Sequence, residues 1–400
     1  MRHATLALLL AGCFNAQNTP GEPLGPVTEG TTYRRDLQPL IAQHCQGCHT
    51  AGGISPFALD TFEDAQRHGG AMAAATQSRS MPPWMPDEQG CQPLKGSRRL
   101  TDAEVKLFQS WVEAGMPEGA PAQPMPVKQE KGLERVDVSL RLPAPYTPKA
   151  NLTDDYRCFG LSHGQTVDRD IIGVNVKPGV RQMVHHVLIY AVDPVQAAAS
   201  DAADPGVGWE CFAGPGTNAK MIGGWVPGTS ATQYPSGTGI PLLARETVVV
   251  QIHYNVLAAG AQTDDTSLEL QLADGRVARP AEFTALANWW FNLPPMAMNQ
   301  TVEASVRTPN AGTVWGVVPH MHTKGRAISV TKNDACLVNV KQWDFHWQQS
   351  FFFAAEDGLE FGAGETVKLS CTFDNPTSAP VTWGEKTSDE MCLVYFYVTR

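Results

Sequence analysis

Two cysteines and a histidine near the start of the chain form a motif with defined chemistry. The sequence Cys45-Gln46-Gly47-Cys48-His49 has the spacing C-x-x-C-H. In this spacing two thiols can bond covalently to the vinyl groups of a haem, and the adjacent histidine can bind the iron. We therefore predict one covalent c-type haem held by Cys45, Cys48 and His49. A redox C-x-x-C pair or half of a zinc site is the alternative.

The haem iron needs a second axial ligand, which we expect from a loop after the motif. A methionine in that position raises the reduction potential of the iron. Met81 is the first candidate because the proline after it disfavours a helical conformation. Met85 is the runner-up, whereas Met72 should lie within a helix. We expect His44 and His68 to be ordinary surface or pocket residues.

Five of the 11 histidines form a second group, in three clusters within apolar, β-rich runs: His185-His186, His253 and His320-x-His322. Residues two apart on a strand face the same side, so His320 and His322 can bind one ion. His185 and His186 should face opposite sides, so sharing an ion would need a strand end or a bulge. Imidazole suits copper, zinc, iron and nickel, and a methionine ligand would favour copper.

Different elements must position these two groups. Within residues 31–120 a helix is predicted over 102–114, because Thr101 and Glu104 can form a capping box and Gly115 can end it. From about residue 136 the sequence becomes rich in short β-type runs separated by turn residues, as in β-sandwiches. These runs are 184–192, 247–256, 267–272, 313–318, 366–373 and 392–398.

Composition sets the broad class of the protein. A chain of 400 residues with 42% hydrophobic content suggests two or three domains, and 36 Gly and 30 Pro are typical of strands joined by turns. The net charge of -10 argues against a nucleic-acid partner, which would need a basic face. No apolar run approaches the roughly 20 residues of a membrane span, which excludes an integral channel or transporter.

The N-terminus indicates export. Residues 1–13 resemble a bacterial lipoprotein signal, with Arg2, an apolar run and a terminal Cys13 that would be acylated. An ordinary secretory signal cut slightly later is the alternative. Residues 14–30 should form a flexible tether. We therefore expect a periplasmic or cell-surface protein that meets a bacterial membrane only through its lipid anchor.

In order and spacing, four motifs resemble the copper type II, ascorbate-dependent monooxygenases, which include peptidylglycine α-hydroxylating monooxygenase and dopamine β-monooxygenase. The motifs are His185-His186, His253-Tyr254, His320-x-His322 and Thr387-Ser388-Asp389-Glu390-Met391-Cys392. The resemblance covers roughly residues 136–400 and implies two jelly-roll-like β-sandwich copper domains, 136–278 and 279–400. A small all-α, cytochrome c-like haem domain over 31–120 and a Pro-rich linker over 121–135 would precede them, within a mainly β protein.

The resemblance also implies two copper sites. His185, His186 and His253 would hold an electron-transfer copper, and His320, His322 and Met391 would hold the copper that binds O2. Two disulfides are implied, Cys158–Cys211 and Cys371–Cys392. Nine cysteines less Cys13, Cys45 and Cys48 leave six, an even number that suits an oxidising compartment. Cys91 and Cys336 are then left over, and we hypothesise that they join the haem domain to the second copper domain.

Members of this family insert one oxygen atom of O2 into a C–H bond and typically take electrons from ascorbate, one at a time. A haem is also a one-electron carrier, so we predict that it feeds the coppers after reduction by an ascorbate-like reductant or a periplasmic redox protein. Peptide-amidating relatives bind a carboxylate with an Arg and use an Asn where this chain has Val318 and Leu393. Tyr395 and Gln251 match the family. We therefore expect a small, neutral or apolar substrate.

Two other classes of function stay open. A non-catalytic lipoprotein that binds copper or passes electrons would keep the ligands but give no oxygen-dependent product. A zinc hydrolase or a metal-free adhesion sandwich is disfavoured by the Met391 motif. We expect the aromatic runs 289–291, 343–347 and 351–353 to pack within the sandwiches. His163 and His346 should be polar surface residues or lie behind the ligands, and Asp264-Asp265 should form a solvated turn.

Overall fold

The computed structural model describes residues 30–53, 55–120, 132–211, 214–216, 218–257, 259–384 and 388–400. The predicted signal over 1–13 with Cys13, nearly all of the tether over 14–30 and most of the linker over 121–135 lie outside these residues. Within the described part of the chain, none of the helices has the length and apolar character needed to cross a bilayer.

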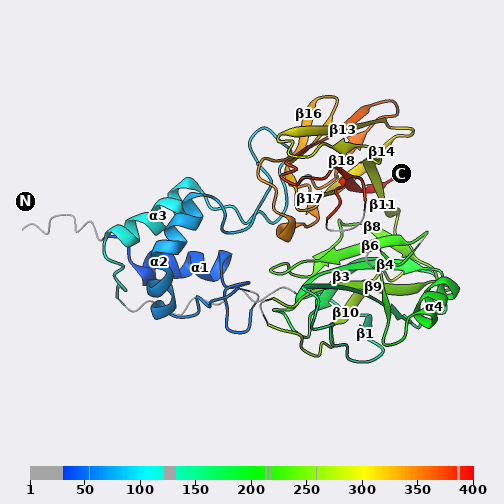
Figure 1. Cartoon of the computed structure of the whole chain (residues 1–400), viewed down its shortest axis with the longest axis horizontal. Coiled ribbons are helices and arrows are strands. Elements are labelled where there is room, and N and C mark those ends of the chain that lie inside the picture. Colours follow the sequence, from blue (N-terminus) through cyan, green and yellow to red (C-terminus); the bar gives the residue numbers. More distant parts are fainter. Residues whose placement is uncertain are drawn as a thin grey trace, which may run out of the picture.

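The N-terminal part of the chain is helical and has its own core (Figure 1). It contains η1 (Tyr33–Leu37), α1 (Gln38–His44), α2 (Phe62–Gln77) and α3 (Asp102–Glu113). Leu37, Phe108 and Trp111 are buried at the centre of this cluster. The predicted helix is confirmed as α3, with both hydrogen bonds of the Thr101–Glu104 capping box present.

The remainder of the described chain is mainly β. Its strands are β1 (Val138–Arg141), β2 (Asp154–Leu161), β3 (Arg169–Lys177), β4 (Val184–Val192), β5 (Trp209–Glu210), β6 (Lys220–Trp225), β7 (Thr232–Gln233), β8 (Thr238–Leu242), β9 (Thr247–Asn255), β10 (Ser267–Leu272), β11 (Arg279–Asn288), β12 (Asn292–Leu293), β13 (Gln300–Arg307), β14 (Gly312–His320), β15 (Gly325–Lys332), β16 (Ala335–Val340), β17 (Phe351–Phe352), β18 (Leu359–Phe361), β19 (Thr366–Phe373), β20 (Val381–Thr382) and β21 (Cys392–Thr399). Two short helices interrupt them, α4 (Pro194–Ala203) and η2 (Phe345–Trp347). The six predicted runs are confirmed as β4, β9, β10, β14, β19 and β21, within one or two residues at each end.

Several sheets fit the expectation of β-sandwiches. A five-stranded sheet has the order β5-β2-β9-β4-β6, and a four-stranded sheet has the order β13-β19-β15-β16. Apolar side chains of the first sheet pack against β1, β3, β8 and β10, and those of the second pack against β14 and β21. We call the strands β1 to β10 the first half of the β region and the strands β11 to β21 the second half. A short parallel pairing of β8 with β11 continues one sheet from the first half into the second.

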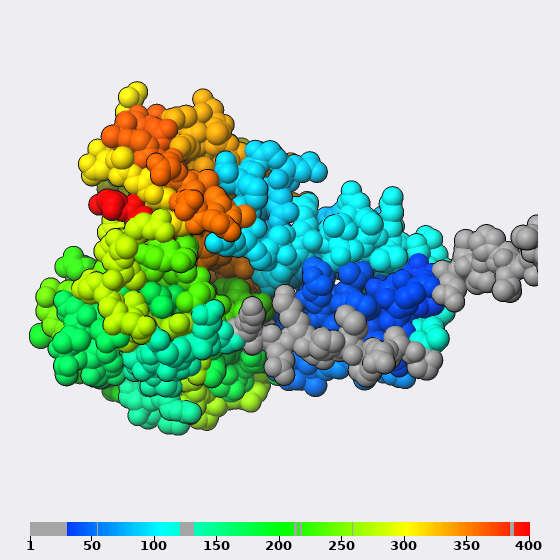
Figure 2. All heavy atoms as spheres, turned by 180° about the vertical axis from the view of Figure 1, so that it is seen from behind, coloured from blue at the N-terminus to red at the C-terminus, as the bar shows by residue number. Residues whose placement is uncertain are grey.

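The segment between α2 and α3 leaves the helical cluster and docks on the second half of the β region (Figures 1 and 2). Cys91 forms a disulfide with Cys336, which confirms the hypothesised pairing. Trp84 is buried in the core of that half, and its ring meets Phe351 edge-on. The haem-motif part of the chain is therefore covalently joined to the β region.

The other two implied disulfides, Cys158–Cys211 and Cys371–Cys392, are also present, while Cys45 and Cys48 are not disulfide-bonded. The expectation of a solvated turn at Asp264 is wrong, because this carboxylate is fully buried. It accepts hydrogen bonds from the backbone N–H groups of Val180 and Thr266 and from the Tyr254 hydroxyl. These three donors replace the water that the carboxylate loses.

Candidate metal centres

Two neighbouring strands of the five-stranded sheet, β4 and β9, supply the first centre, which we define as His185, His186 and His253. In the register of the sheet, His253 on β9 lies opposite His186 on β4 and Tyr156 on β2. Directly paired residues project from the same face of a sheet, so these side chains lie side by side. The pattern of pairing thus joins two histidines that are far apart in the sequence.

His185 reaches the same face through an irregularity in β4. Val184 pairs with Tyr254 and His186 pairs with His253, so β4 advances two residues where β9 advances one. The extra residue is a β-bulge, which re-aims a side chain without ending the strand. The bulge that the sequence required for a shared ion is therefore present, and Val184 still points into the core.

The three imidazoles converge through their Nδ1 atoms. Nδ1 of His186 lies 3.2 Å from Nδ1 of His185 and 3.3 Å from Nδ1 of His253. One ligand nitrogen from each histidine lies within 4.8 Å of the other two. A tetrahedral ion with nitrogen ligands at 2.0–2.1 Å would hold them about 3.3 Å apart. The spacing therefore fits the three nitrogens around one ion.

A carboxylate fixes the orientation of His253. Nε2 of His253 donates to Oδ1 of Asp154 over 2.7 Å, and the ring of Tyr156 stacks on the imidazole at a centroid distance of 4.2 Å. A histidine whose outer N–H is bound to a carboxylate presents its other nitrogen as a lone pair. Sequence analysis missed Asp154, because it lies 99 residues before its partner and outside the matching motifs.

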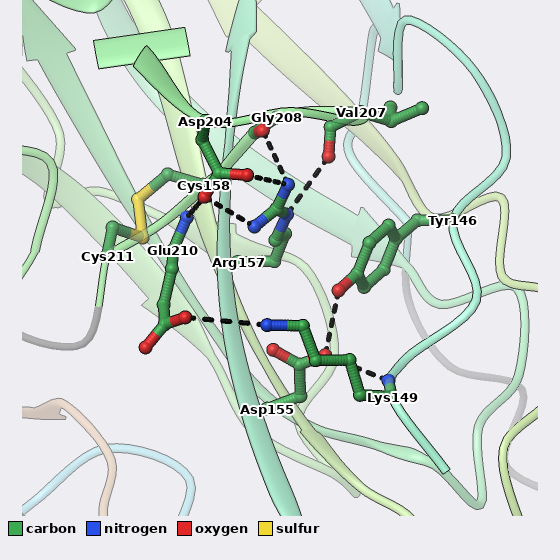
Figure 3. A network of polar contacts seen from close by, with 10 residues as sticks. All are labelled: Tyr146, Lys149, Asp155, Arg157, Cys158, Asp204, Val207, Gly208, Glu210 and Cys211. Carbon is green, nitrogen blue, oxygen red and sulfur yellow. Dashed lines mark hydrogen bonds and ion pairs between the residues drawn. A yellow bond between two sulfur atoms is a disulfide. The ribbon is translucent and has the colours of Figure 1, made fainter. Parts of the chain in front are cut away.

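Asp154 and Tyr156 share one face of β2, and a polar network on the other face holds the strand in place (Figure 3). The guanidinium of Arg157 is almost fully buried and bonds both carboxylate oxygens of Asp204 at 2.9 Å. It also donates to the backbone carbonyls of Val207 and Gly208. The network ties β2 to the segment after α4, and so indirectly supports the first centre.

The histidines of the first centre are neutral at physiological pH. Burial, together with the effect of the neighbouring His253, lowers the pKa of His185 to about 3. Burial also lowers the pKa values of His186 and His253. A metal needs a neutral imidazole, so these side chains lose no proton when an ion binds.

His320, His322 and Met391 form the second centre. β14 ends at His320, and the alternation of a strand continues for two more residues, so that Met321 is buried in the core while both histidines face the other way. The two rings lie 5.2 Å apart between centroids. Nδ1 of His320 contacts Oε1 of Gln348, and Nδ1 of His322 lies 3.2 Å from the carbonyl oxygen of Asp389. Both Nε2 atoms are thereby left as the ligand nitrogens.

A buried carboxylate beside the methionine organises this centre. Glu390 accepts hydrogen bonds from the backbone N–H groups of His322 at 2.9 Å, Lys324 at 2.6 Å and Met391 at 3.2 Å. Burial raises the pKa of Glu390 to about 7, against the stabilising effect of these three donors. Glu390 thus joins the turn that holds His322 to the start of the strand after Met391. Sequence analysis passed over it, although a carboxylate beside a soft ligand was a usable signal.

Both centres face one cavity of about 270 Å³ between the two halves of the β region. His185, His186, His320, His322 and Met391 all line it. Among the residues that the structure describes, no Lys, Arg, Asp or Glu side chain lines the cavity. Its remaining wall is mostly apolar and aromatic: Leu188, Met221, Trp225, Val226, Trp289, Val318, Phe345, Trp383, Leu393 and Tyr395.

Several residues expected to be structural lie at this cavity instead. Trp289 lines it and meets Trp383 at 4.4 Å between ring centroids, while Trp290 is 90% exposed. Phe345 and His346, in η2, line it as well. His163, by contrast, is buried away from the cavity and bonds the carbonyl oxygen of Glu246. The expectation that the aromatic runs pack within the sandwiches is confirmed for Trp343, Phe351 and Phe353, which are buried in the core of the second half. It is wrong for Trp289, because β11 ends at Asn288, before this residue.

The haem motif lies between the helical cluster and the cavity wall. Nδ1 of His49 lies 3.2 Å from the carbonyl oxygen of Phe57, which leaves Nε2 as its metal-binding nitrogen. Burial raises the pKa of the Cys45 thiol to about 12. Met85 packs on the core of the second half, and its sulfur accepts from the N–H of Asp344. Met81 is half-buried and Met72 lies in the helical core.

The loop after β6 contacts the haem motif directly. Gly228 has a φ of +76°, and a Cβ placed there would lie 2.5 Å from Sγ of Cys48, so only glycine fits this approach. Arg98 donates to the carbonyl oxygen of Gly228 and, over 2.9 Å, to Oε1 of Gln349. Gln349 also lines the cavity. One arginine of the N-terminal part therefore bridges both halves of the β region.

Comparison with known proteins finds one family that part of the chain resembles. Residues 296–399 match the C-terminal domain of the copper type II ascorbate-dependent monooxygenases, and this stretch contains all three residues of the second centre. The match supports the resemblance of this chain to that family. Members of the family bind copper, so the match implies a copper-dependent monooxygenase. The search of curated proteins found no match to the chain.

Solved structures with some similarity include the major capsid protein P2 of Bacteriophage PM2, at 8% identity over 65% of this chain and 96% of that chain, with a TM-score of 0.29. A fucolectin from striped bass (Morone saxatilis) serum is 9% identical over 62% of this chain and 84% of that chain, with a TM-score of 0.18. Similarities this low carry no argument about fold or function.

Proposed function

We propose that this protein hydroxylates a C–H bond of a small, neutral or apolar organic substrate with O2, using two copper ions and electrons delivered through a fused c-type haem. The single observation behind the proposal is the cavity on which both centres lie. In the proposed reaction one oxygen atom of O2 enters the C–H bond and the other leaves as water. Two electrons and two protons complete the balance.

The ligand sets fit copper at both centres. Three neutral imidazole nitrogens suit copper at the first centre, and the thioether of Met391 beside two imidazoles favours copper over zinc at the second. Copper bound there would supply the one-electron chemistry that O2 activation requires. The chain itself orients the ligands through Asp154, Gln348 and Glu390 and surrounds the site with apolar side chains.

The cavity supports a substrate without charge. Val318 on β14 pairs with Tyr395 on β21, and both side chains face the cavity where peptide-amidating relatives bind a carboxylate with an Arg. Leu393 lines the same wall. An uncharged wall favours neutral or apolar substrates, because a buried carboxylate without a partner is unstable. Val318→Arg should therefore create affinity for carboxylate-bearing compounds that the parent protein lacks.

The contact between Cys48 and Gly228 supports electron delivery by the haem. A c-type haem is bonded to its cysteine sulfurs, and Gly228, which approaches Sγ of Cys48, stands between the cavity-lining residues Val226 and Thr229. Cys45, Cys48 and His49 would hold the haem, and the docked position of Met85 favours Met81 as the second axial ligand. Export and a lipid anchor at Cys13 suit this chemistry, since covalent haem and disulfides belong to an oxidising compartment.

The decisive experiment measures metal and haem in protein matured in a bacterial periplasm and then loaded with copper. We expect about two coppers and one covalent haem per chain, and about one copper in His320→Ala. Haem without copper, or zinc held tightly instead, would reject the enzyme and favour the non-catalytic electron carrier. Copper and haem with no oxygen-dependent product from any neutral substrate would favour the copper-binding lipoprotein.

The haem route has its own test. Met81→Ala should abolish turnover driven by a protein electron donor and spare turnover driven by a chemical reductant. Arg98→Leu should slow the first reaction while keeping the haem spectrum, with exposed Arg99→Leu as the matched control. Equal loss with both donors would contradict electron delivery by the haem.

A further inference from the structure

The first centre has a fourth histidine beside it that comes from the other half of the β region. His346 lies in η2, and its ring centroid is 5.4 Å from that of His185. Within the first centre itself, the centroids of His185 and His186 are 5.5 Å apart, and those of His185 and His253 are 4.7 Å apart. His346 thus lies against His185 at a ring separation like those within the first centre, whereas the ligand atoms that all lie within 4.8 Å of one another are those of His185, His186 and His253.

The orientation of His346 leaves one nitrogen for a metal. Nδ1 of His346 bonds Oδ1 of Asp344 over 2.9 Å, and the same oxygen accepts the backbone N–H of His346. A carboxylate on Nδ1 leaves Nε2 as the metal-binding nitrogen. The arrangement repeats the pairing of His253 with Asp154, in which a carboxylate holds the outer nitrogen of a ligand.

The turn that presents His346 is held from two sides. The N–H of Asp344 donates to the sulfur of Met85, on the segment that Cys91 joins to Cys336. After the turn, Oε1 of Gln348 contacts Nδ1 of His320 in the second centre. The side chain of His346 itself is 63% exposed, so core packing does not fix its rotamer.

Resting on the proposed copper at the first centre, we propose that His346 is a fourth ligand of that copper, contributed by the second half of the β region. Copper at the first centre then links the two halves across the cavity. Four imidazoles around one ion complete the tetrahedral coordination that three neutral imidazoles leave open. Asp344 acts as the positioning residue of this ligand.

The test uses the full chain with His322→Ala, which leaves copper at the first centre alone. X-ray absorption and electron paramagnetic resonance count the imidazoles bound to that copper, and a competition titration gives its affinity. With His346→Ala added, we expect one imidazole fewer and an affinity about 10- to 100-fold lower. Added imidazole should restore the parent spectrum. Asp344→Asn should give a smaller loss of affinity, and the exposed neighbour Gln342→Ala should change nothing.

Unchanged spectra and affinity in His346→Ala would overturn the inference and leave the proposed function intact. If the His322→Ala protein binds no copper, both the inference and the proposed function fail. An altered spectrum that imidazole does not restore would also overturn it, because this result means a general disturbance of the site rather than a lost ligand.

Discussion

The first and second centres lie on the same cavity, and they obtain their ligands in different ways. The first takes its nitrogens from two paired strands, where a bulge at His185 turns an adjacent pair of histidines to one side. The second takes His320 and His322 from a strand end and Met391 from the residue before β21. One centre is built by sheet pairing, the other by two turns meeting.

The residues that orient the histidines also differ between the two centres. Asp154, a charged partner, orients His253 from a strand that the Arg157–Asp204 network holds. In the second centre neutral groups orient the histidines, and the carboxylate of Glu390 binds only backbone N–H groups. With copper bound as proposed, the all-nitrogen set would suit electron transfer, and the set with a thioether, which favours Cu(I), would suit O2 binding.

The largest expected effect is loss of one copper from either centre. His253→Ala and His320→Ala should each reduce bound copper from about two ions per chain to about one. Each substitution leaves its centre with two of its three protein ligands. Metal analysis after copper loading measures this. If either variant loses both ions, the two centres are not independent and the comparison between them fails.

Glu390→Ala should destabilise the second half of the β region. Three backbone N–H groups, one buried and two partly buried, lose their acceptor at about 1 kcal/mol each, so the free energy of unfolding should fall by about 3 kcal/mol. Glu390→Gln keeps one side-chain oxygen as an acceptor, so its free energy of unfolding should fall by less. Chemical denaturation followed by tryptophan fluorescence measures both. The first centre should keep its copper affinity in the folded protein.

Removing the residue that orients a histidine should lower copper affinity by different factors at the two centres. Asp154→Ala, in a His320→Ala background, should weaken copper binding at the first centre about 10- to 100-fold. Gln348→Ala, in a His253→Ala background, should weaken the second centre by a smaller factor, because hydrogen bonds to a charged partner are stronger. Competition titrations give both affinities, and a larger loss in Gln348→Ala would reverse the proposed order.

The smallest effect concerns acid. The hydrogen bond from Arg157 lowers the pKa of Asp204 below its usual range. The ionised Asp204 carboxylate therefore contributes fully to stability above about pH 4, which is the pKa of Asp in the unfolded chain. This contribution is lost as the pH falls through the lower pKa that Asp204 has in the folded protein. Asp204→Asn should remove this part of the pH dependence and slightly lower the Tm at pH 7. Thermal melts of the parent protein and of Asp204→Asn between pH 3 and 7 would detect the difference. The same dependence of Tm on pH in both proteins would contradict the prediction.

Local sequence was informative where a few residues decide the outcome. Runs of β-type residues between turn residues predicted β4, β9 and β14, and strand periodicity correctly required a bulge if His185 and His186 were to share an ion. The capping box at Thr101 marked the start of α3. Residue type failed as a guide for Asp264 and Trp289, because burial of one and exposure of the other depend on segments far away in the chain.

The sequence by itself determined which residue types could bind haem and metal, since motif spacing and strand periodicity are properties of neighbouring residues. Only the tertiary structure decided that both centres line one cavity, that Asp154 orients His253 and that His346 faces His185. Those placements depend on contacts between parts of the chain 99 to 245 residues apart, such as the Cys91–Cys336 disulfide. Such contacts form only when whole faces pack together, because local preferences do not specify which faces meet.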